Sequence, residues 1–487
     1  MFYLRGITSY NPEDASYPPP DKGVTVQLSS PPVALDRPAP IRGGRSVLLV
    51  ATLILTVVAF QLNSSMISPA LPDIAKQLGA PMDAVSQVSS LFFLAGAVGG
   101  IVLARWSDFI GRKRALLIVL ALIVLGTLLC LVSPNLPVLL LGRVLQGASS
   151  AAFQISYVIL AETLPAAVFP TVLGVLTAIN GGVGGVDGWI GGLLADAYGF
   201  RSLFVVILVV AVIAIASVAL AVPRDGAPSS TGRMDWWGAG ALSLGLICLT
   251  YFVSTGSGQG WFAPLTLLFL AGTVVALVSF VFIEKRRRTP LVAVQHLRSR
   301  QVWPVLAVTV LTLSSVFAVI NFTIVILSQN QTAGYGMNAS TSALLYLTPP
   351  ALIGLAAAPL SGWLAGRFGW IPMLRIGLVL SIAAITVVAL FPFSPWTVFA
   401  MFAVLGIAYN GVVLTTTNGL GVLQSPSEAP AILPSMNGTA FGFGASLGIA
   451  IVAPFVMSGD FVLALWISVG ISALALVASL FLMPKTD

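Results

Sequence analysis

The chain alternates between long apolar runs and short polar segments along almost its whole length. Fourteen apolar runs recur, and a helix of about 20 such residues crosses the hydrocarbon core of a bilayer. The runs cover residues 47–67, 87–105, 115–134, 137–160, 169–195, 202–222, 237–255, 263–283, 303–326, 342–362, 374–393, 395–420, 435–457 and 462–483. The pattern therefore predicts an all-α membrane protein with 14 transmembrane helices.

Composition and charge agree with this prediction. Hydrophobic residues make up 57% of the chain and charged residues only 8%, which is too few charges for the surface of a soluble protein. The net charge of +7 follows from topology. With a cytoplasmic N-terminus, all of the 23 lysines and arginines except Lys76, Arg143 and Arg201 fall on the inner side, as the positive-inside rule requires. We expect a multi-pass protein of the cell (inner) membrane with both termini cytoplasmic, and no nucleic-acid partner.

The sequence offers little chemistry for an enzyme. Cys130 and Cys248 are far apart and form no C-x-x-C pair, and the only histidine is His296, so metal sites and His-dependent triads are disfavoured. No P-loop motif for nucleotide hydrolysis is present. The glycines of "GFGASLG" (442–448) lie inside an apolar run and predict close helix packing that permits rocking. We expect a non-enzyme without metal or cofactor.

One polar interruption, "RWSDFIGRKRA" (105–115), is unusually rich in charge. Orientation signals alone explain Arg112 and Arg114. They do not explain Asp108, or Gly111, which suits a tight turn between two helices. An acid here can cap the next helix or pair with an arginine. We expect such a pairing to hold two helix bundles shut on the inner side.

Several segments together resemble the major facilitator superfamily. The stretch 104–114 resembles its loop signature between the second and third helices, and "LGRVLQG" (141–147) resembles its R-x-x-Q-G motif. "SSMISPALPDIAKQL" resembles a segment of its drug-exporter branch. The stretch 233–261 resembles the seventh span of its fourteen-helix drug:proton antiporter group. The resemblance covers residues 46–485 and implies a transporter.

An internal repeat supports two related halves. "GWLAGRFG" (362–369) aligns with "ARWSDFIG" (104–111), which adds Arg367 to the inner gate, and duplicated halves are typical of such transporters. We expect a disordered cytoplasmic tail (1–45), an N-terminal six-helix bundle (46–222) and a C-terminal six-helix bundle (301–487). Two extra helices with a basic loop (223–300) lie between the bundles in the sequence.

Asp187, in the fifth apolar run, is the first candidate for proton coupling. Helical spacing places Asn180, Gly184 and Gly191 on its face, and a low-dielectric setting favours a neutral carboxyl. Such a group can take up and release a proton. The region resembles the antiporter motif of the superfamily, with Gly191 in place. The alternative is that Asp187 pairs permanently with a buried donor.

Polar residues in other runs predict the walls of a substrate cavity, because polar groups are costly in lipid. Arg143, Gln154 and Tyr157 share one stripe of the fourth run. Arg143 is a second proton-coupling candidate, as a partner for Asp187 or for a protonated relay; the alternative is that it reaches the outer headgroups. The full set of cavity candidates is Gln61, Asn63, Ser65, Gln146, Gln154, Tyr157, Asn180, Asn321 and Asn410. For the last two, hydrogen bonds between helices are an equal alternative.

These features predict a secondary transporter that exports small amphipathic or cationic compounds by alternating access, driven by the proton gradient. A major facilitator transporter of a narrow metabolite class, importing or exporting, is the close alternative. A non-transporting receptor or scaffold fits less well, because it has no use for polar groups that converge inside helices. The expected partners are a small-molecule substrate, protons and the lipid bilayer, and we expect a monomer.

Overall fold

The computed structural model describes residues 44–164, 169–225, 234–287, 299–424 and 432–483. The expected tail lies outside these residues except for its last two, and so does His296. Residues 41–487 form one compact unit. Within the described ranges every regular element is helical.

The first half of this unit contains six crossing helices, the first and fourth of which are interrupted. In chain order the elements are α1 (Gly44–Ser65), η1 (Ser68–Ala70), α2 (Leu71–Leu78), α3 (Met82–Val85), α4 (Gln87–Ile110), α5 (Arg112–Leu131), α6 (Leu136–Ala148), α7 (Ala151–Thr163), α8 (Phe169–Tyr198) and α9 (Arg201–Ala221).

Two uninterrupted helices then precede a second set of six crossings. They are α10 (Trp236–Gln259) and α11 (Pro264–Arg286). The second set consists of α13 (Trp303–Thr312), η2 (Leu313–Phe317), η3 (Val319–Thr323), α14 (Ile324–Gln329), α15 (Ala339–Tyr346), α16 (Thr348–Phe368), α17 (Trp370–Leu390), α18 (Pro395–Leu405), η4 (Gly406–Val413), α19 (Leu414–Leu423), α20 (Ile432–Met457) and α21 (Phe461–Leu480).

The fourteen predicted crossings are confirmed. Thirteen helical segments of the described chain are long and apolar enough to cross a membrane. The remaining crossing is α8, which is 30 residues long and covers the predicted fifth run. The chain is therefore a multi-pass membrane protein.

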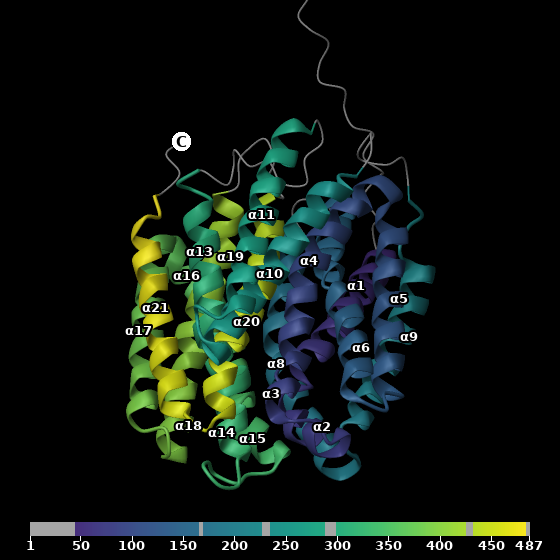
Figure 1. Ribbon diagram of the computed structural model, residues 1–487. Helices are drawn as coiled ribbons and strands as arrows, with labels where there is room; N and C mark the ends of the chain where they lie inside the picture. The colour runs from purple at the N-terminus through teal and green to yellow at the C-terminus, as the bar shows by residue number, and fades with distance from the viewer. Residues whose placement is uncertain (1–43, 165–168, 226–233, 288–298, 425–431, 484–487) are drawn as a thin grey trace, which may run out of the picture. The chain divides into compact units, whose positions relative to one another are not determined.

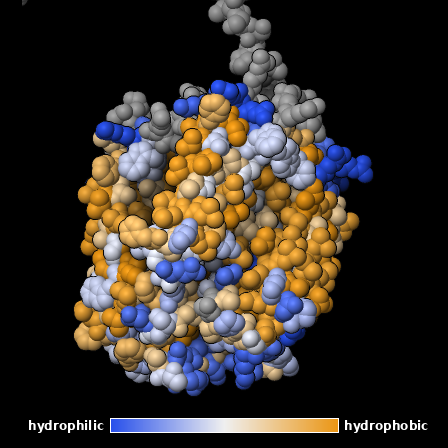
Figure 2. Space-filling model, viewed as in Figure 1, coloured by the Kyte–Doolittle hydropathy of each residue, from blue (hydrophilic) through white to orange (hydrophobic). Residues whose placement is uncertain are grey.

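The two ends of the unit differ in charge. The last residues of α4, α9, α11 and α16 and the first residues of α5, α10, α13 and α17 lie at one end, which we call the basic end because Arg112, Arg286 and Arg367 lie there. The connections at 65–87, 198–201, 329–339 and 457–461 form the opposite end. In Figure 1 the basic end is at the top. Apolar surface dominates between the two ends on the face shown in Figure 2.

The six-helix sets lie side by side, and the hairpin of α10 and α11 crosses in front of their boundary (Figure 1). A small apolar cluster joins this hairpin to both sets, since Ala239 and Phe280 of the hairpin pack with Ile101 of α4 and, on the other side, with Met436 of α20. The hairpin is therefore attached to both halves.

Several predicted continuous runs are locally irregular. The fourth crossing breaks between α6 and α7, where Ser149 Oγ donates to the Gln146 carbonyl and Ser150 Oγ donates to the Gly96 carbonyl of α4. Such side-chain bonds compete with the helical ladder. The segments η2, η3 and η4 are π-helical, a form that is often found at functional sites.

The internal repeat recurs in backbone geometry. Gly111 joins α4 to α5 with φ 98° and ψ 149°, and Gly369 joins α16 to α17 with φ 98° and ψ 141°. These are the two glycines that the sequence repeat aligns. A positive φ of this size is strained for other residues, so the same turn requires glycine in both halves.

The first six-helix set contains a very close helix approach. A Cβ atom added to Gly99 of α4 would overlap the backbone of Ala148 in α6. Backbone cannot give way as a flexible side chain does, so a larger residue must push the two helices apart.

We predict that Gly99→Ala destabilises the folded protein by about 1–3 kcal/mol, the usual cost of overpacking. The measurement is the thermal unfolding midpoint of the purified protein in detergent. Gly470→Ala in α21 is the matched control, because a Cβ there meets open space and alanine is the better helix former. Equal midpoints for the two variants would contradict the close approach.

Candidate functional site

The helix α8 contacts both halves of the molecule through two glycine-lined faces. On the first face the glycines lie against α1 and the residue after it: Gly184 is near Gln61 and Gly191 near Met66, whereas Gly188 lies nearest Leu347 of the second half. On the second face Gly185 lies against Leu347 and Ala351, and Gly192 against Ala339 and Ser340. The absence of side chains at these positions lets both neighbours approach closely.

Asp187 lies on the face of α8 that meets α1. Its side chain is 2% exposed, and Ser65 Oγ donates a 2.6 Å hydrogen bond to Oδ2. Gln61 Nε2 in turn donates to Ser65 Oγ over 3.3 Å. Asp187 Oδ1 has no hydrogen-bond partner among the described residues. A buried carboxyl with one neutral partner is well placed to bind a proton, because burial disfavours its charged form.

Arg143 is completely buried in α6 and does not pair with Asp187. Its Nε donates to the Val88 carbonyl over 3.0 Å, and Nη1 donates to the Asn63 carbonyl and to Gln146 Oε1. The guanidinium carbon also lies 4.1 Å from the centre of the Phe92 ring. These contacts connect α6 with α1 and α4. Arg143 therefore neither pairs with Asp187, as the sequence predicted, nor reaches the headgroups, which was the alternative.

The other polar residues of this half lie in different environments. Asn63 and Gln146 are fully buried, and Gln146 Nε2 donates to Thr127 of α5, which points it away from the boundary between the halves. Gln154 and Tyr157 are partly buried. Gln154 Nε2 lies 2.6 Å from the position that a Cβ of Gly438 in α20 would take, so Gln154 reaches the second half. The side chain of Asn180 lies outside the described residues.

Asn321 and Asn410, the cavity candidates of the second half, both lie in π-helical segments. Asn321 Nδ2 donates to the Phe317 carbonyl of its own crossing helix over 3.3 Å. Asn410 Nδ2 donates to the Pro350 carbonyl of α16 over 2.9 Å. Both side chains are partly buried. For Asn410 this is the interhelical hydrogen bond that the sequence left as an alternative.

Sequence reasoning missed Thr309 and Asn437, which form an amide chain with Asn418 in the second half. Thr309 Oγ1 donates to Asn437 Oδ1 over 2.6 Å, and Asn437 Nδ2 donates to Asn418 Oδ1 over 3.2 Å. Asn437 is 6% exposed, whereas Asn418 is exposed. Gly438, which contacts Gln154, follows Asn437 directly. The polarity of Asn437 within an apolar run was the available signal.

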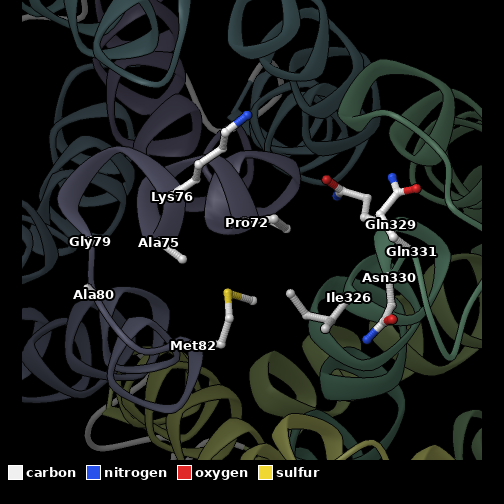
Figure 3. Close-up of a pocket in the computed structure, with 10 residues that line it drawn as sticks. All are labelled: Pro72, Ala75, Lys76, Gly79, Ala80, Met82, Ile326, Gln329, Asn330 and Gln331. Atoms are coloured by element: carbon white, nitrogen blue, oxygen red, sulfur yellow. The ribbon is translucent and has the colours of Figure 1, made fainter.

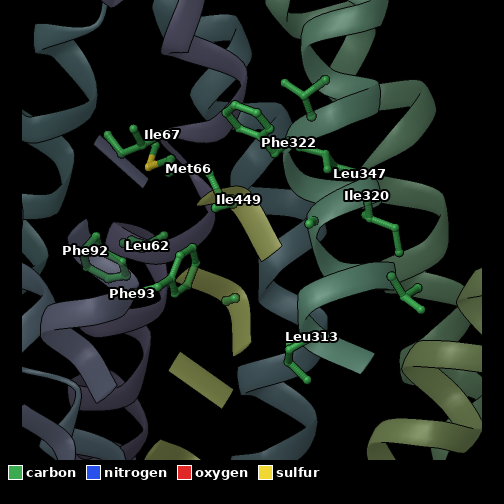
Figure 4. Close-up of a cluster of buried hydrophobic side chains, with 14 of the residues drawn as sticks. Leu62, Met66, Ile67, Phe92, Phe93, Leu313, Ile320, Phe322, Leu347 and Ile449 are labelled. Carbon is green, nitrogen blue, oxygen red and sulfur yellow. The ribbon is translucent and has the colours of Figure 1, made fainter. Parts of the chain in front are cut away.

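An apolar seam joins the two halves beside these polar groups. It consists of Leu62, Met66, Ile67, Phe92, Phe93, Leu313, Ile320, Phe322, Leu347 and Ile449 (Figure 4). Phe93 of α4 and Phe317 of η2 meet edge to face with ring centres 5.2 Å apart, and Phe317 also meets Phe441 of α20 at 5.7 Å. Aromatic rings from both halves are thus in edge-to-face contact across the boundary.

The expected inner-gate residues form a network within the first half. Asp108 pairs with Arg105 at 2.6 Å and with Arg112 at 2.5 Å. Arg112 also pairs with Glu162 of α7 at 3.4 Å. Asp108 thus takes the arginine partner that the sequence allowed.

A different acid caps the helix that follows. Asp225 accepts hydrogen bonds from the backbone N–H groups of Lys113 and Arg114 at the start of α5. In the second half, Arg367 lies over the rings of Trp363 and Phe368. The ion pairs of Asp108 with Arg105 and Arg112 therefore lie within one bundle.

The clearest polar links between the halves lie elsewhere. Near the opposite end, Asp196 of α8 accepts hydrogen bonds from the backbone N–H groups of Ala339 (3.1 Å) and Ser340 (2.8 Å), the first residues of α15. Thr348 Oγ1 donates to the Gly185 carbonyl. The carboxylate of one half thus caps a helix of the other, where the helix dipole adds to the attraction.

A cavity of about 520 Å³ opens at the opposite end between the halves. Lys76 and Met82 line it from the first half, and Ile326 and Gln329 line it from the second (Figure 3). Asp187 and Ser65 are not among its lining residues. The cavity is therefore separate from the buried carboxyl.

Comparisons with known proteins add three findings. The family model described as Major Facilitator Superfamily matches residues 53–449. A uridine/deoxyuridine transporter of Lactococcus lactis is 34% identical, over 84% of this chain and 87% of that protein. The multidrug resistance protein Stp of Mycobacterium tuberculosis is 26% identical, over 84% of this chain and 74% of that protein.

A solved structure shows the same fold. A POT family transporter in complex with 5-aminolevulinic acid superposes with a TM-score of 0.66 at 15% identity. The match covers 88% of this chain and 96% of that one. At this identity the likeness concerns the arrangement of helices alone.

We predict that Asp196→Ala loosens the contact between the halves at the opposite end. Two hydrogen bonds to a charged group are lost, so we expect roughly tenfold faster maleimide labelling of a Leu347→Cys reporter in detergent. Leu347 is 3% exposed, and both native cysteines are buried. Asp73→Ala is the control, because Asp73 accepts from the Phe200 N–H within one half. Equal labelling rates in both variants would show that Asp196 does not hold the halves together.

Proposed function

Because the chain belongs to the major facilitator superfamily, we propose that it transports a narrow class of small polar metabolites, with pyrimidine nucleosides as the first substrates to test. The observation that carries this proposal is the likeness to the uridine/deoxyuridine transporter along most of both chains. That the chain is a multi-pass transporter of this superfamily follows from its family and fold; the substrate is the proposed part.

The described side chains are compatible with an uncharged ligand that has polar edges and flat faces. A uracil ring offers carbonyl acceptors and an N–H donor, which amide side chains can pair with. Asn418 is exposed at the end of the amide chain, and Gln154 approaches Gly438 from the other half. The rings of Phe93, Phe317 and Phe441 meet edge to face at the same boundary, and aromatic side chains suit a planar base.

Export of amphipathic or cationic drugs is the second candidate, favoured by the likeness to the multidrug resistance protein Stp. A cationic drug calls for an acid that faces the substrate. Asp187 instead is buried and bonded to Ser65. We therefore rank the metabolite above the drug.

We further propose that Asp187 carries the coupling proton and that the basic end is cytoplasmic. The burial of Asp187 and its hydrogen bond from the neutral Ser65 hydroxyl support the first part. The positive-inside rule supports the second. Alternating access then requires the contact of Asp196 with α15 to form and break in each cycle.

For the substrate, we predict that proteoliposomes loaded with uridine accumulate labelled uridine by counterflow, an assay that does not depend on the direction of coupling. Deoxyuridine should compete and ethidium should not. Ethidium transport without uridine counterflow would favour the drug exporter instead.

A substitution in the amide chain tests whether its side chains bind uridine. Asn418→Ala should raise the KM for uridine roughly tenfold, the effect of one or two lost hydrogen bonds. The control is Asn135→Ser, because Asn135 caps α6 at the opposite end and serine is an equally good cap. An unchanged KM for Asn418→Ala would remove the amide chain from the site.

For coupling, we predict that Asp187→Asn abolishes uridine accumulation driven by a pH gradient but retains counterflow. Asparagine keeps the shape and the hydrogen bond from Ser65 but binds no proton in this range. Asp460→Asn is the control, since Asp460 is an exposed cap of α21 and asparagine also caps well. Accumulation that survives in Asp187→Asn would exclude Asp187 as the proton carrier.

A further inference from the structure

The hairpin of α10 and α11 has a hollow on its surface at the basic end. The cavity measures about 380 Å³ and is lined by Trp237, Phe282, Ile283, Arg286 and Arg287. These two helices are less buried within the protein than the other eleven helical segments of membrane-spanning length in the described chain. The hollow therefore lies on the pair of membrane-length helices that is least covered by the rest of the described chain.

Two arginines line this hollow, and each side chain is held by a different contact. The Arg286 guanidinium carbon lies 3.9 Å from the centre of the Phe282 ring. Arg287 Nε lies 3.3 Å from Asp235 Oδ1. Asp235 is itself buried and accepts a hydrogen bond from the Gly238 N–H, at the start of α10. The ring and the buried acid thus limit where the two guanidinium groups can go.

The floor of the hollow is apolar and continues along the hairpin. Phe282 and Ile283 lie beside the arginines, and Val274, Val275 and Val278 of α11 are exposed below them. Trp237 is 74% exposed, and tryptophan is typical of the level at which headgroups meet acyl chains. A charged rim with an apolar track beneath it matches a molecule that is anionic at one end and apolar at the other.

We propose that this hollow binds one anionic phospholipid, with its phosphate on Arg286 and Arg287 and its acyl chains along α11. Arginine forks bind phosphate oxygens in pairs. Basic hollows near the headgroup level are known to select anionic lipids. A free phosphate ion would use the charges alone and would leave the apolar track and Trp237 without a role.

The test is native mass spectrometry of the purified full-length protein, titrated with phosphatidylglycerol and, separately, with phosphatidylcholine. The wild type should bind phosphatidylglycerol more tightly. Arg286→Gln should weaken this binding roughly fivefold, the effect of about one favourable surface charge. Arg286→Gln combined with Arg287→Gln should remove the preference over phosphatidylcholine. Arg286→Gln alone keeps the test valid if loss of Arg287, the partner of buried Asp235, harms folding.

Matched variants separate the hollow from general surface charge. Arg300→Gln removes one arginine at the same end of the molecule without altering the hollow, and it should leave binding unchanged. Trp237→Ala keeps every charge but removes the apolar wall, and it should weaken lipid binding. Equal losses in Arg300→Gln and Arg286→Gln would overturn the proposal.

A competition arm distinguishes the two sources of phosphate. Millimolar inorganic phosphate should fail to displace phosphatidylglycerol from the wild type. Displacement by inorganic phosphate, together with unchanged lipid binding in Trp237→Ala, would identify a free-anion site and overturn the lipid assignment. Because these readouts measure binding and not transport, they are independent of the proposed substrate.

Discussion

The close packing of α8 against both halves is the constraint on which the rest of the structure depends. One face of this helix meets α1 and the other meets α15 and α16, and glycines lie at both contacts. Asp187 and Asp196 belong to the same helix, so the buried carboxyl and the cap on α15 are rigidly connected. The contact with α1 at Asp187 and the contact with α15 at Asp196 therefore lie on one continuous helix that meets both halves.

Much of the fold could be predicted from the sequence, because the length of each apolar run matches the thickness of the hydrocarbon core that a helix must cross. The repeat around Gly111 and Gly369 was also readable, since the same turn needs glycine twice. The π-helical segments and the break at Ser149 could not be read. They depend on which carbonyl a side chain or neighbouring helix satisfies, and that is settled only by packing.

The site was predicted less completely than the fold. Asp187 stood out because an acid inside an apolar run is costly, but its partner Ser65 lies in a distant run. Arg143 was expected near Asp187, whereas backbone carbonyls of α1 and α4 satisfy it. Those carbonyls carry no signal in the sequence. The amide chain through Asn437 was missed for the related reason that its members come from three separate crossings.

The equivalent turns at Gly111 and Gly369 are unequally braced. The first is held by Asp108, Glu162 and Asp225, which connect it to α7 and to the segment after α9. At the second, Arg367 rests on the neighbouring rings of Trp363 and Phe368. Two turns with the same backbone geometry at the same end of the molecule therefore have different surroundings: ion pairs at Gly111 and aromatic rings at Gly369. The duplication has preserved the path of the backbone but not the side-chain contacts that surround it.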